Sequence, residues 1–149
     1  MKTKILATIV ILVVMLSCVS TKSTLKNVDE NAPEPTLTSD GYFAIAQKTT
    51  DKKYGYHKDY PINVFYKNAK DEEINIKRFL NALTGPNGEK ISYKKLENCC
   101  PFPTTKTEMG AGLLDVYEVS YPEISKPVQL YFNNYSKGQL YIPVGFSAK

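Results

Sequence analysis

The chain has 149 residues, of which 19 are Lys or Arg and 15 are Asp or Glu, with three Cys, one His and no Trp. The basic residues are scattered among acidic ones, and the sequence contains no Gly-rich phosphate loop. This pattern argues against a nucleic-acid partner. The length suits one small domain behind a short leader.

The N-terminus has the pattern of a secretory signal. Lys2 and Lys4 precede an apolar run over residues 5–16 that only Thr8 interrupts. Such a charged start followed by a short apolar stretch is typical of signal peptides. The run is too short to cross a bilayer, which takes about 20 apolar residues.

A cysteine follows the apolar run directly. The letters MLSC end in Cys18 and resemble the lipobox of bacterial lipoproteins, although the usual motif has Leu and a small residue in its first two places. We therefore predict a lipoprotein signal peptide over residues 1–17 and acyl chains on Cys18, which would anchor the chain to a membrane. The alternative is ordinary signal cleavage after Ser20, which would give a soluble product.

The next stretch is rich in Ser, Thr, Asn and Pro and poor in large apolar residues. We predict that residues 18–40 form a flexible tether and that residues 41–149 form a single domain. Surface-exported lipoproteins of the Bacteroidetes often carry an acidic cluster just behind the cysteine. Here two lysines come first and Asp29 and Glu30 lie further on, so we expect an outer-membrane lipoprotein that faces the periplasm.

One helix is predicted in the domain. Apolar residues recur at the helical spacing i, i+3, i+4 and i+7, at Ile76, Phe79, Leu80 and Leu83. Acidic residues 71–73 suit the start of a helix, and Gly85-Pro86 suits its end. We expect a short helix over residues 71–84. The rival interpretation is a strand that runs into the Asn87-Gly88 hairpin turn.

Several strands are predicted around this helix. Apolar and polar residues alternate over residues 113–121, 127–135 and 140–144, which predicts an antiparallel C-terminal meander with Pro143 in an edge strand. Further candidate strands lie at residues 42–47, 61–66 and 91–96. The expected fold class is α+β, a small antiparallel sheet with one short helix packed on it.

Two adjacent cysteines stand between prolines in the stretch LENCCPFP. If Cys18 is acylated, Cys99 can form a disulfide within the chain only with Cys100. We favour a structural role, either a vicinal disulfide that tightens the backbone or two buried thiols. A redox switch or a thiol that captures a partner is the alternative.

No metal site is expected, because two adjacent thiols and the single His57 do not supply the ligand set of zinc. A catalytic pair would require His57 to meet Cys99 or Cys100 in space. Asp115 lies on the apolar face of its predicted strand, which suits either a carboxylate tuned by burial or a strand end that reaches solvent.

Eleven tyrosines are present. Tyrosine is a good strand former and fills half-buried sheet faces, which explains most of them. Three exposed tyrosines, Tyr54, Tyr56 and Tyr60, are candidates for an interface with a sugar or a peptide.

Several blocks together resemble a known family. The segments YGYHKDYPINV, RFLNALTGPNGEKISYKKLENCCPF, LLDVYEVSY and PVQLYFNNY, followed by PVGF, are similar to blocks that recur in this order in small Bacteroidetes lipoproteins. The chain departs from that pattern at Glu97-Asn98, where Gly-Ser is usual, and at Tyr60. Members often carry the name 2-dehydro-3-deoxyphosphooctonate aldolase, so the resemblance implies that activity and a place in the envelope.

The residues themselves favour binding over catalysis. A Schiff-base lysine must be desolvated or placed beside another cation, whereas the pairs Lys52-Lys53 and Lys94-Lys95 are expected in solvent. We therefore expect a lipid-anchored cell-envelope protein with a non-catalytic binding or accessory domain, without a cofactor, whose partner is an envelope protein or a glycan. The alternative is an enzyme, either the aldolase or one that uses the cysteine pair.

Overall fold

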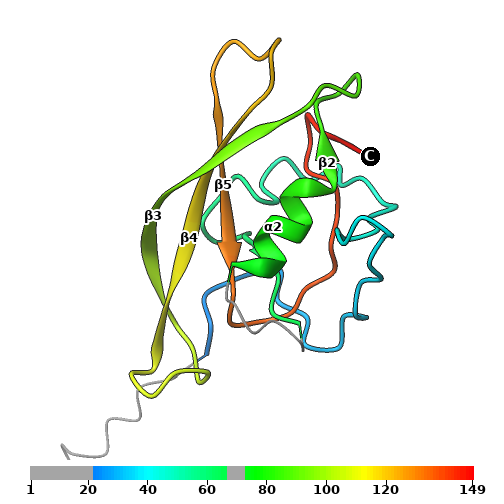
Figure 1. The fold of residues 1–149 in the computed structure, drawn as a ribbon. Coiled ribbons are helices and arrows are strands. Elements are labelled where there is room, and N and C mark those ends of the chain that lie inside the picture. Colours follow the sequence, from blue (N-terminus) through cyan, green and yellow to red (C-terminus); the bar gives the residue numbers. More distant parts are fainter. Residues whose placement is uncertain (1–21, 67–72) are drawn as a thin grey trace, which may run out of the picture.

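The computed structural model describes residues 22–66 and 73–149. Its elements are β1 (Ile62–Asn63), α2 (Ile74–Asn81), β2 (Leu83–Thr84), β3 (Ser92–Pro103), β4 (Ala111–Ser120), β5 (Val128–Asn133) and β6 (Ser147–Ala148). Figure 1 labels α2 and the strands β2 to β5. One helix and a small, mostly antiparallel sheet make an α+β fold, which confirms the expected class.

The main sheet has four strands in the order β1-β5-β4-β3. Strands β3, β4 and β5 form an antiparallel meander, and the short β1 pairs in parallel with β5. Strand β4 lies between two neighbours and is buried on both faces, because Leu114 and Val116 point to one side and Tyr117 and Val119 to the other. This strand therefore runs through the middle of the domain.

The helix α2 lies across one face of the sheet (Figure 1). Its residues Ile76, Phe79 and Leu80 are buried, as their spacing predicts, and the ring of Phe79 meets that of Phe132 on β5 edge to face at 5.7 Å between centroids. The helix is shorter than expected, because Leu83-Thr84 pairs with β6. The predicted start at residues 71–72 lies outside the described residues.

The predicted strands are confirmed in part. Residues 91–96 belong to the long β3, and residues 113–121 and 127–135 contain β4 and β5. Residues 140–144 do not form a strand, contrary to the expected meander, because only Ile142 there forms a bridge, to Lys48. The third strand of the meander is thus β3.

The segment expected as a flexible tether contacts the domain over its described part, residues 22–40. Leu25 and Ala32 are buried, although the composition of the segment is polar. The amide of Lys26 donates to the carbonyl of Asp59 at 2.8 Å, and that of Asp29 to the carbonyl of Lys137 at 2.9 Å. Packed structure therefore begins well before residue 41.

Candidate functional site

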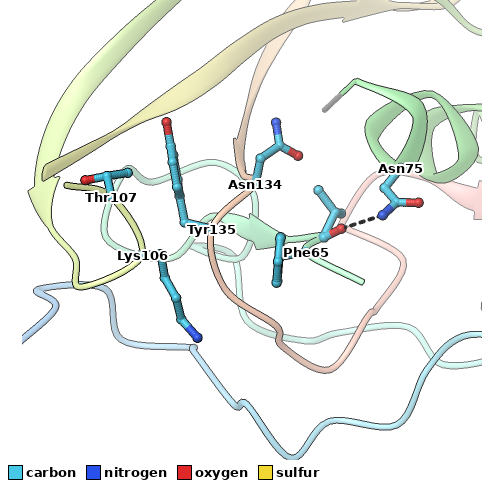
Figure 2. Close-up of a pocket in the computed structure, with 7 residues that line it drawn as sticks. Phe65, Asn75, Lys106, Thr107, Asn134 and Tyr135 are labelled. Carbon is cyan, nitrogen blue, oxygen red and sulfur yellow. Dashed lines mark hydrogen bonds between the residues drawn. The ribbon is translucent and has the colours of Figure 1, made fainter. Parts of the chain in front are cut away.

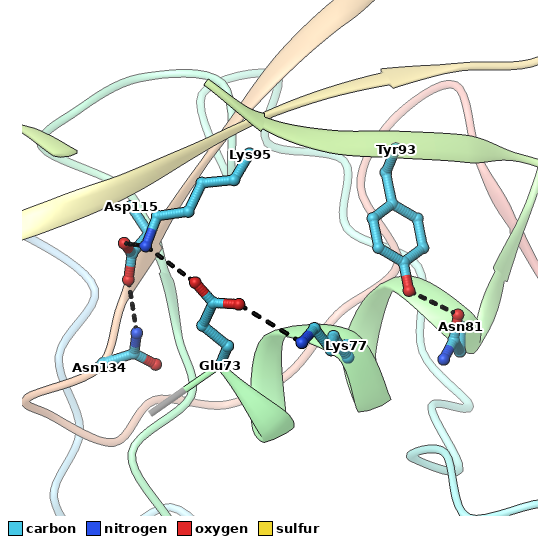
Figure 3. Close-up of polar contacts among 7 residues, drawn as sticks. All are labelled: Glu73, Lys77, Asn81, Tyr93, Lys95, Asp115 and Asn134. Carbon is cyan, nitrogen blue, oxygen red and sulfur yellow. Dashed lines mark hydrogen bonds and ion pairs between the residues drawn. The ribbon is translucent and has the colours of Figure 1, made fainter. Parts of the chain in front are cut away.

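A cluster of charged side chains joins the start of α2 to the sheet (Figure 3). Lys95 on β3 lies 2.7 Å from Asp115 on β4 and 3.0 Å from Glu73, the residue before α2. Lys77, one helical turn into α2, lies 3.4 Å from the same Glu73. Two ammonium groups and two carboxylates thus balance each other.

Two asparagines complete the hydrogen bonds of the buried carboxylate. The amide of Asn98 donates to one oxygen of Asp115 at 2.7 Å, and the amide of Asn134 donates to the other at 2.6 Å. Asp115 is 6% exposed, so these bonds replace the water that burial removes. The carboxylate is therefore buried at a partnered position rather than at a strand end that reaches solvent.

The cluster fixes the charge of its members. Burial alone would lower the pKa of the Lys95 ammonium, but its hydrogen bonds to Asp115 and Glu73 outweigh burial and raise that pKa. The hydrogen bond from Lys95 lowers the pKa of Glu73, and Lys77 acts in the same direction. Lys95 is thus a firmly protonated amine, unlike the lysine of a Schiff-base enzyme, whose pKa is lowered.

The hydroxyl of Tyr117 is buried on the face of β4 that carries this cluster. Tyr117 is two residues beyond Asp115 on the same face of β4, and it is opposite Lys95 in the sheet register. Its hydroxyl has no hydrogen-bond partner within the described part of the chain. Burial, helped by the nearby charge of Glu73, raises the pKa of Tyr117 to about 12, so the phenol stays neutral.

Two adjoining hollows open beside the charged cluster, and they share Asn134 and Tyr135. One, of about 360 Å³, is lined by Val64, Phe65, Asn75, Lys106, Thr107, Asn134 and Tyr135 (Figure 2). The other, of about 370 Å³, is lined by Glu73, Lys95, Asn98, Leu113, Asp115, Asn134 and Tyr135. We call the two together the polar cleft.

The ring of Tyr135 forms an aromatic wall of the polar cleft, and it can lie there because residue 112 is a glycine. A Cβ atom on Gly112 would come within 2.9 Å of ring atoms of both Phe102 and Tyr135, so the absence of a side chain lets both rings lie close to β4. Tyr135 then stands between Thr107 and Asn134 (Figure 2). The arrangement gives the cleft a rigid ring next to polar groups.

Groups that line the polar cleft but take no part in the charged cluster can contact a ligand. Asn134 donates its amide to Asp115, and no described residue hydrogen-bonds to its carbonyl oxygen Oδ1. Phe65 presents an aromatic ring that is 45% exposed, and Lys106 adds an exposed ammonium at the rim. An aromatic face beside amide and hydroxyl groups suits an uncharged polar ligand.

The cysteine pair lies near the end of β3, directly after Asn98. Cys99 and Cys100 are joined by a disulfide, and Cys100 has a positive φ of 59° at a register shift between β3 and β4. Cys100 packs beside the apolar cluster of Leu25, Phe102 and Leu114. The pair forms part of the surface on which the N-terminal segment lies.

The three tyrosines predicted to form an interface are not all accessible. Tyr54 is buried in the core, contrary to the expectation that it is exposed, because its ring packs on Tyr141 and its hydroxyl accepts a hydrogen bond from the Tyr141 amide at 3.1 Å. Burial raises the pKa of Tyr54. Tyr56 and Tyr60 are half-buried.

His57 does not meet the cysteines in any contact of the described residues. Its ring lies 3.8 Å from a carboxylate oxygen of Asp59 and packs edge to face on Tyr60. Among residues 22–66 and 73–149, no group of three or more His, Cys, Asp or Glu is placed to hold a metal ion.

The sequence pointed to only one member of the polar cleft in advance. The place of Asp115 on an apolar strand face singles it out, whereas Glu73 and Asn134 are not predicted as site residues. Lys95 was expected in solvent, but its side chain is only one-third exposed, because it pairs with Asp115 and Glu73. Lys95 could have been located only from the pairing of β3 with β4, which places it opposite Tyr117 on the face that also carries Asp115. The sequence alone does not give that register. Cys18 lies outside the described residues.

Comparison with known proteins gives no relative. No family model, no curated protein and no solved structure matches the chain. No helix in the described part of the chain is long and apolar enough to span a membrane.

Proposed function

We propose that this protein is a lipid-anchored component of the cell envelope, acylated at Cys18 and held on the periplasmic face of the outer membrane. We further propose that its domain binds an uncharged saccharide of the envelope in the polar cleft and catalyses no reaction. The signal-like N-terminus and the MLSC motif support the anchor. The geometry of the polar cleft supports the binding role.

The observation that carries the binding role is the combination of an aromatic wall with internally neutralised charges. Lys95 lies within 3.0 Å of both Asp115 and Glu73, and Lys106 at the rim lies 3.9 Å from Glu30, so each described lysine that lines the polar cleft has an acidic partner. Tyr135 and Phe65 supply ring surface, and the Asn134 oxygen Oδ1, to which no described residue donates, supplies an acceptor. A sugar ring has an apolar face and peripheral hydroxyl donors, which fit these groups.

The same groups make catalysis a weaker proposal. The amine of Lys95 is held protonated by two carboxylates, so it is a poor nucleophile for the aldolase chemistry that the family resemblance implies. Cys99 and Cys100 are bonded to each other, so neither is a free thiol in this state. Asp115 has hydrogen bonds to both carboxylate oxygens.

The test of binding is a titration of the protein with the tetramer of N-acetylglucosamine, followed by NMR. We expect the side-chain amide signal of Asn134 and the ring signals of Tyr135 to shift on addition of the sugar. The variant Phe65→Ala should weaken binding, since it removes an exposed ring from the polar cleft. Its control is Leu37→Ala, which removes a similarly exposed apolar group, 47% against 45%, that does not line the cleft.

Two results would count against this role. The absence of any shift at millimolar sugar would reject saccharide binding of this kind. Equal weakening by Phe65→Ala and Leu37→Ala would place the ligand elsewhere. The anchor has a separate test, because the intact mass of protein purified from its host membranes must correspond to a chain that begins at Cys18 and carries acyl groups.

A further inference from the structure

The N-terminal segment is fastened to one end of the main sheet. Leu25 is buried in a cluster with Phe102 of β3 and Leu114 of β4. The hydrogen bond from the Lys26 amide to the Asp59 carbonyl, 2.8 Å long, holds the next residue. The path of the chain is therefore fixed from Leu25 onward, where β3 leads toward its turn with β4.

This attachment shortens the distance that an anchor at Cys18 can span. Seven peptide steps lead from Cys18 to Leu25, so even a fully extended chain reaches at most about 25 Å. A tether that stayed free up to Asp40 would allow about 75 Å. A membrane that holds Cys18 must therefore lie close to the end of the sheet at which Leu25 is packed.

The turn between β3 and β4 projects from that end. It comprises residues 104–110 and begins two residues after Phe102, the residue on which Leu25 packs. Figure 1 shows the first described residues of the chain beside this turn. Its residue Met109 is 89% exposed, the highest value among the large apolar side chains that the structure describes.

Basic groups accompany this apolar tip. Lys106 is exposed in the turn, and Lys58 lines the hollow of about 480 Å³ that Leu25 and Phe102 also line. Glu108 in the turn, Asp59 beside Lys58 and Glu30, which lies 3.9 Å from Lys106, offset this charge. An exposed apolar side chain at the tip of a turn, among lysines and carboxylates that balance each other, suits insertion among the headgroups of a lipid surface.

We propose that the turn of residues 104–110 rests on the same lipid surface that holds Cys18, with Met109 inserted among the headgroups. This inference rests on the lipid anchor proposed above. A side chain that leaves water at a membrane surface stabilises the contact, and a second contact beside an acyl anchor orients the domain. The surface that this turn contacts is thus lipid, and the connection between β4 and β5 points away from that surface.

The experiment uses the full chain, expressed with its signal in a bacterium that processes lipoproteins. The purified protein is placed in nanodiscs of phosphatidylethanolamine and phosphatidylglycerol. An environment-sensitive fluorophore is attached in the variant Met109→Cys. The engineered thiol is the one that reacts, because Cys99 and Cys100 are bonded to each other and Cys18 is acylated.

The matched control is Glu123→Cys, in the connection between β4 and β5. Because β3, β4 and β5 are antiparallel neighbours, this connection lies at the other end of β4, which has 10 residues. That length separates the two sites by about 30 Å. We expect the fluorophore at position 109 to shift to the blue and to be quenched by nitroxide-labelled lipid, and the one at position 123 to do neither.

The outcomes separate this inference from the anchor itself. Lipidated protein in nanodiscs with quenching at neither position, or equal quenching at both, would overturn the contact at the turn and leave the anchor standing. A lipid-free mass that begins after Ser20, with protein absent from the nanodiscs, would overturn both. Quenching at position 109 alone supports both.

Discussion

The two faces of β4 differ in what they bury. On the face toward α2, Asp115 and Tyr117 bury polar atoms between the helix and the sheet. On the opposite face, Leu114 is covered by the apolar side chains of Leu25 and Phe102, and backbone hydrogen bonds such as that from Lys26 to Asp59 hold the N-terminal segment beside them. Buried polar groups are costly unless they are partnered, so the first face requires a specific arrangement, while the second requires only apolar area. The proposed binding role thus depends on the first face, and the proposed attachment depends on the second.

Loss of a carboxylate should affect the two faces of β4 very differently. Asp115→Asn removes a buried charge and leaves Lys95 without its nearest partner. Lys95 is itself one-third exposed, so water replaces part of the interaction and we expect a loss of about 2–3 kcal/mol in the free energy of unfolding. The measurement is urea denaturation at neutral pH.

Its control is another carboxylate on the same strand. Glu118 points to the opposite face and pairs with Lys94 at 3.0 Å, where the lysine is 67% exposed. Glu118→Gln should therefore cost less than about 0.5 kcal/mol. Equal losses for the two variants would remove the contrast between the faces.

The apolar face should respond to truncation of Leu25. Leu25→Ala empties its place between Phe102 and Leu114, and we expect the N-terminal segment to detach locally at a cost of about 1–2 kcal/mol. The readout is hydrogen exchange of the Lys26 amide, which is bonded to Asp59 in the intact protein. Leu37→Ala, at a half-exposed leucine elsewhere, should leave that exchange rate unchanged.

The smallest expected effect concerns the hydroxyl of Tyr117. Because this group has no partner among the described residues, Tyr117→Phe should stabilise the protein by about 1 kcal/mol at pH 7. Tyr60→Phe, at a half-buried tyrosine outside the polar cleft, is the control and should be near neutral. A clear destabilisation by Tyr117→Phe would mean that the hydroxyl makes a bond in solution.

The same variant should change the response to alkali. An unfolded tyrosine ionises near pH 10, whereas the folded Tyr117 has a pKa of about 12. Stability from this raised pKa is complete below pH 10 and falls as the pH rises toward 12, because the unfolded state loses its proton first. Tyr117→Phe should therefore make the decline above pH 10 less steep. An unchanged slope would contradict the assignment.

The fold was predictable where local patterns are strong. The spacing of Ile76, Phe79 and Leu80 located α2, and alternation over residues 113–121 located β4. Residues 140–144 alternate equally well but form no strand, because alternation marks a half-buried extended segment without providing a neighbour for its backbone. The pairing of Leu83-Thr84 with the C-terminus shortened the predicted helix for the same reason, since a distant segment competed for its residues.

By itself, the sequence determined the α+β class, the helix and the central strands, because these depend on periodicity within a few residues. It also singled out Cys99-Cys100 and Asp115 as unusual. Only the tertiary structure decided that Lys95, Glu73 and Asn134 meet around Asp115, since register and helix placement bring together residues far apart in the chain. It also decided that Leu25 packs on the sheet, because one buried leucine in a polar segment gives no periodic signal.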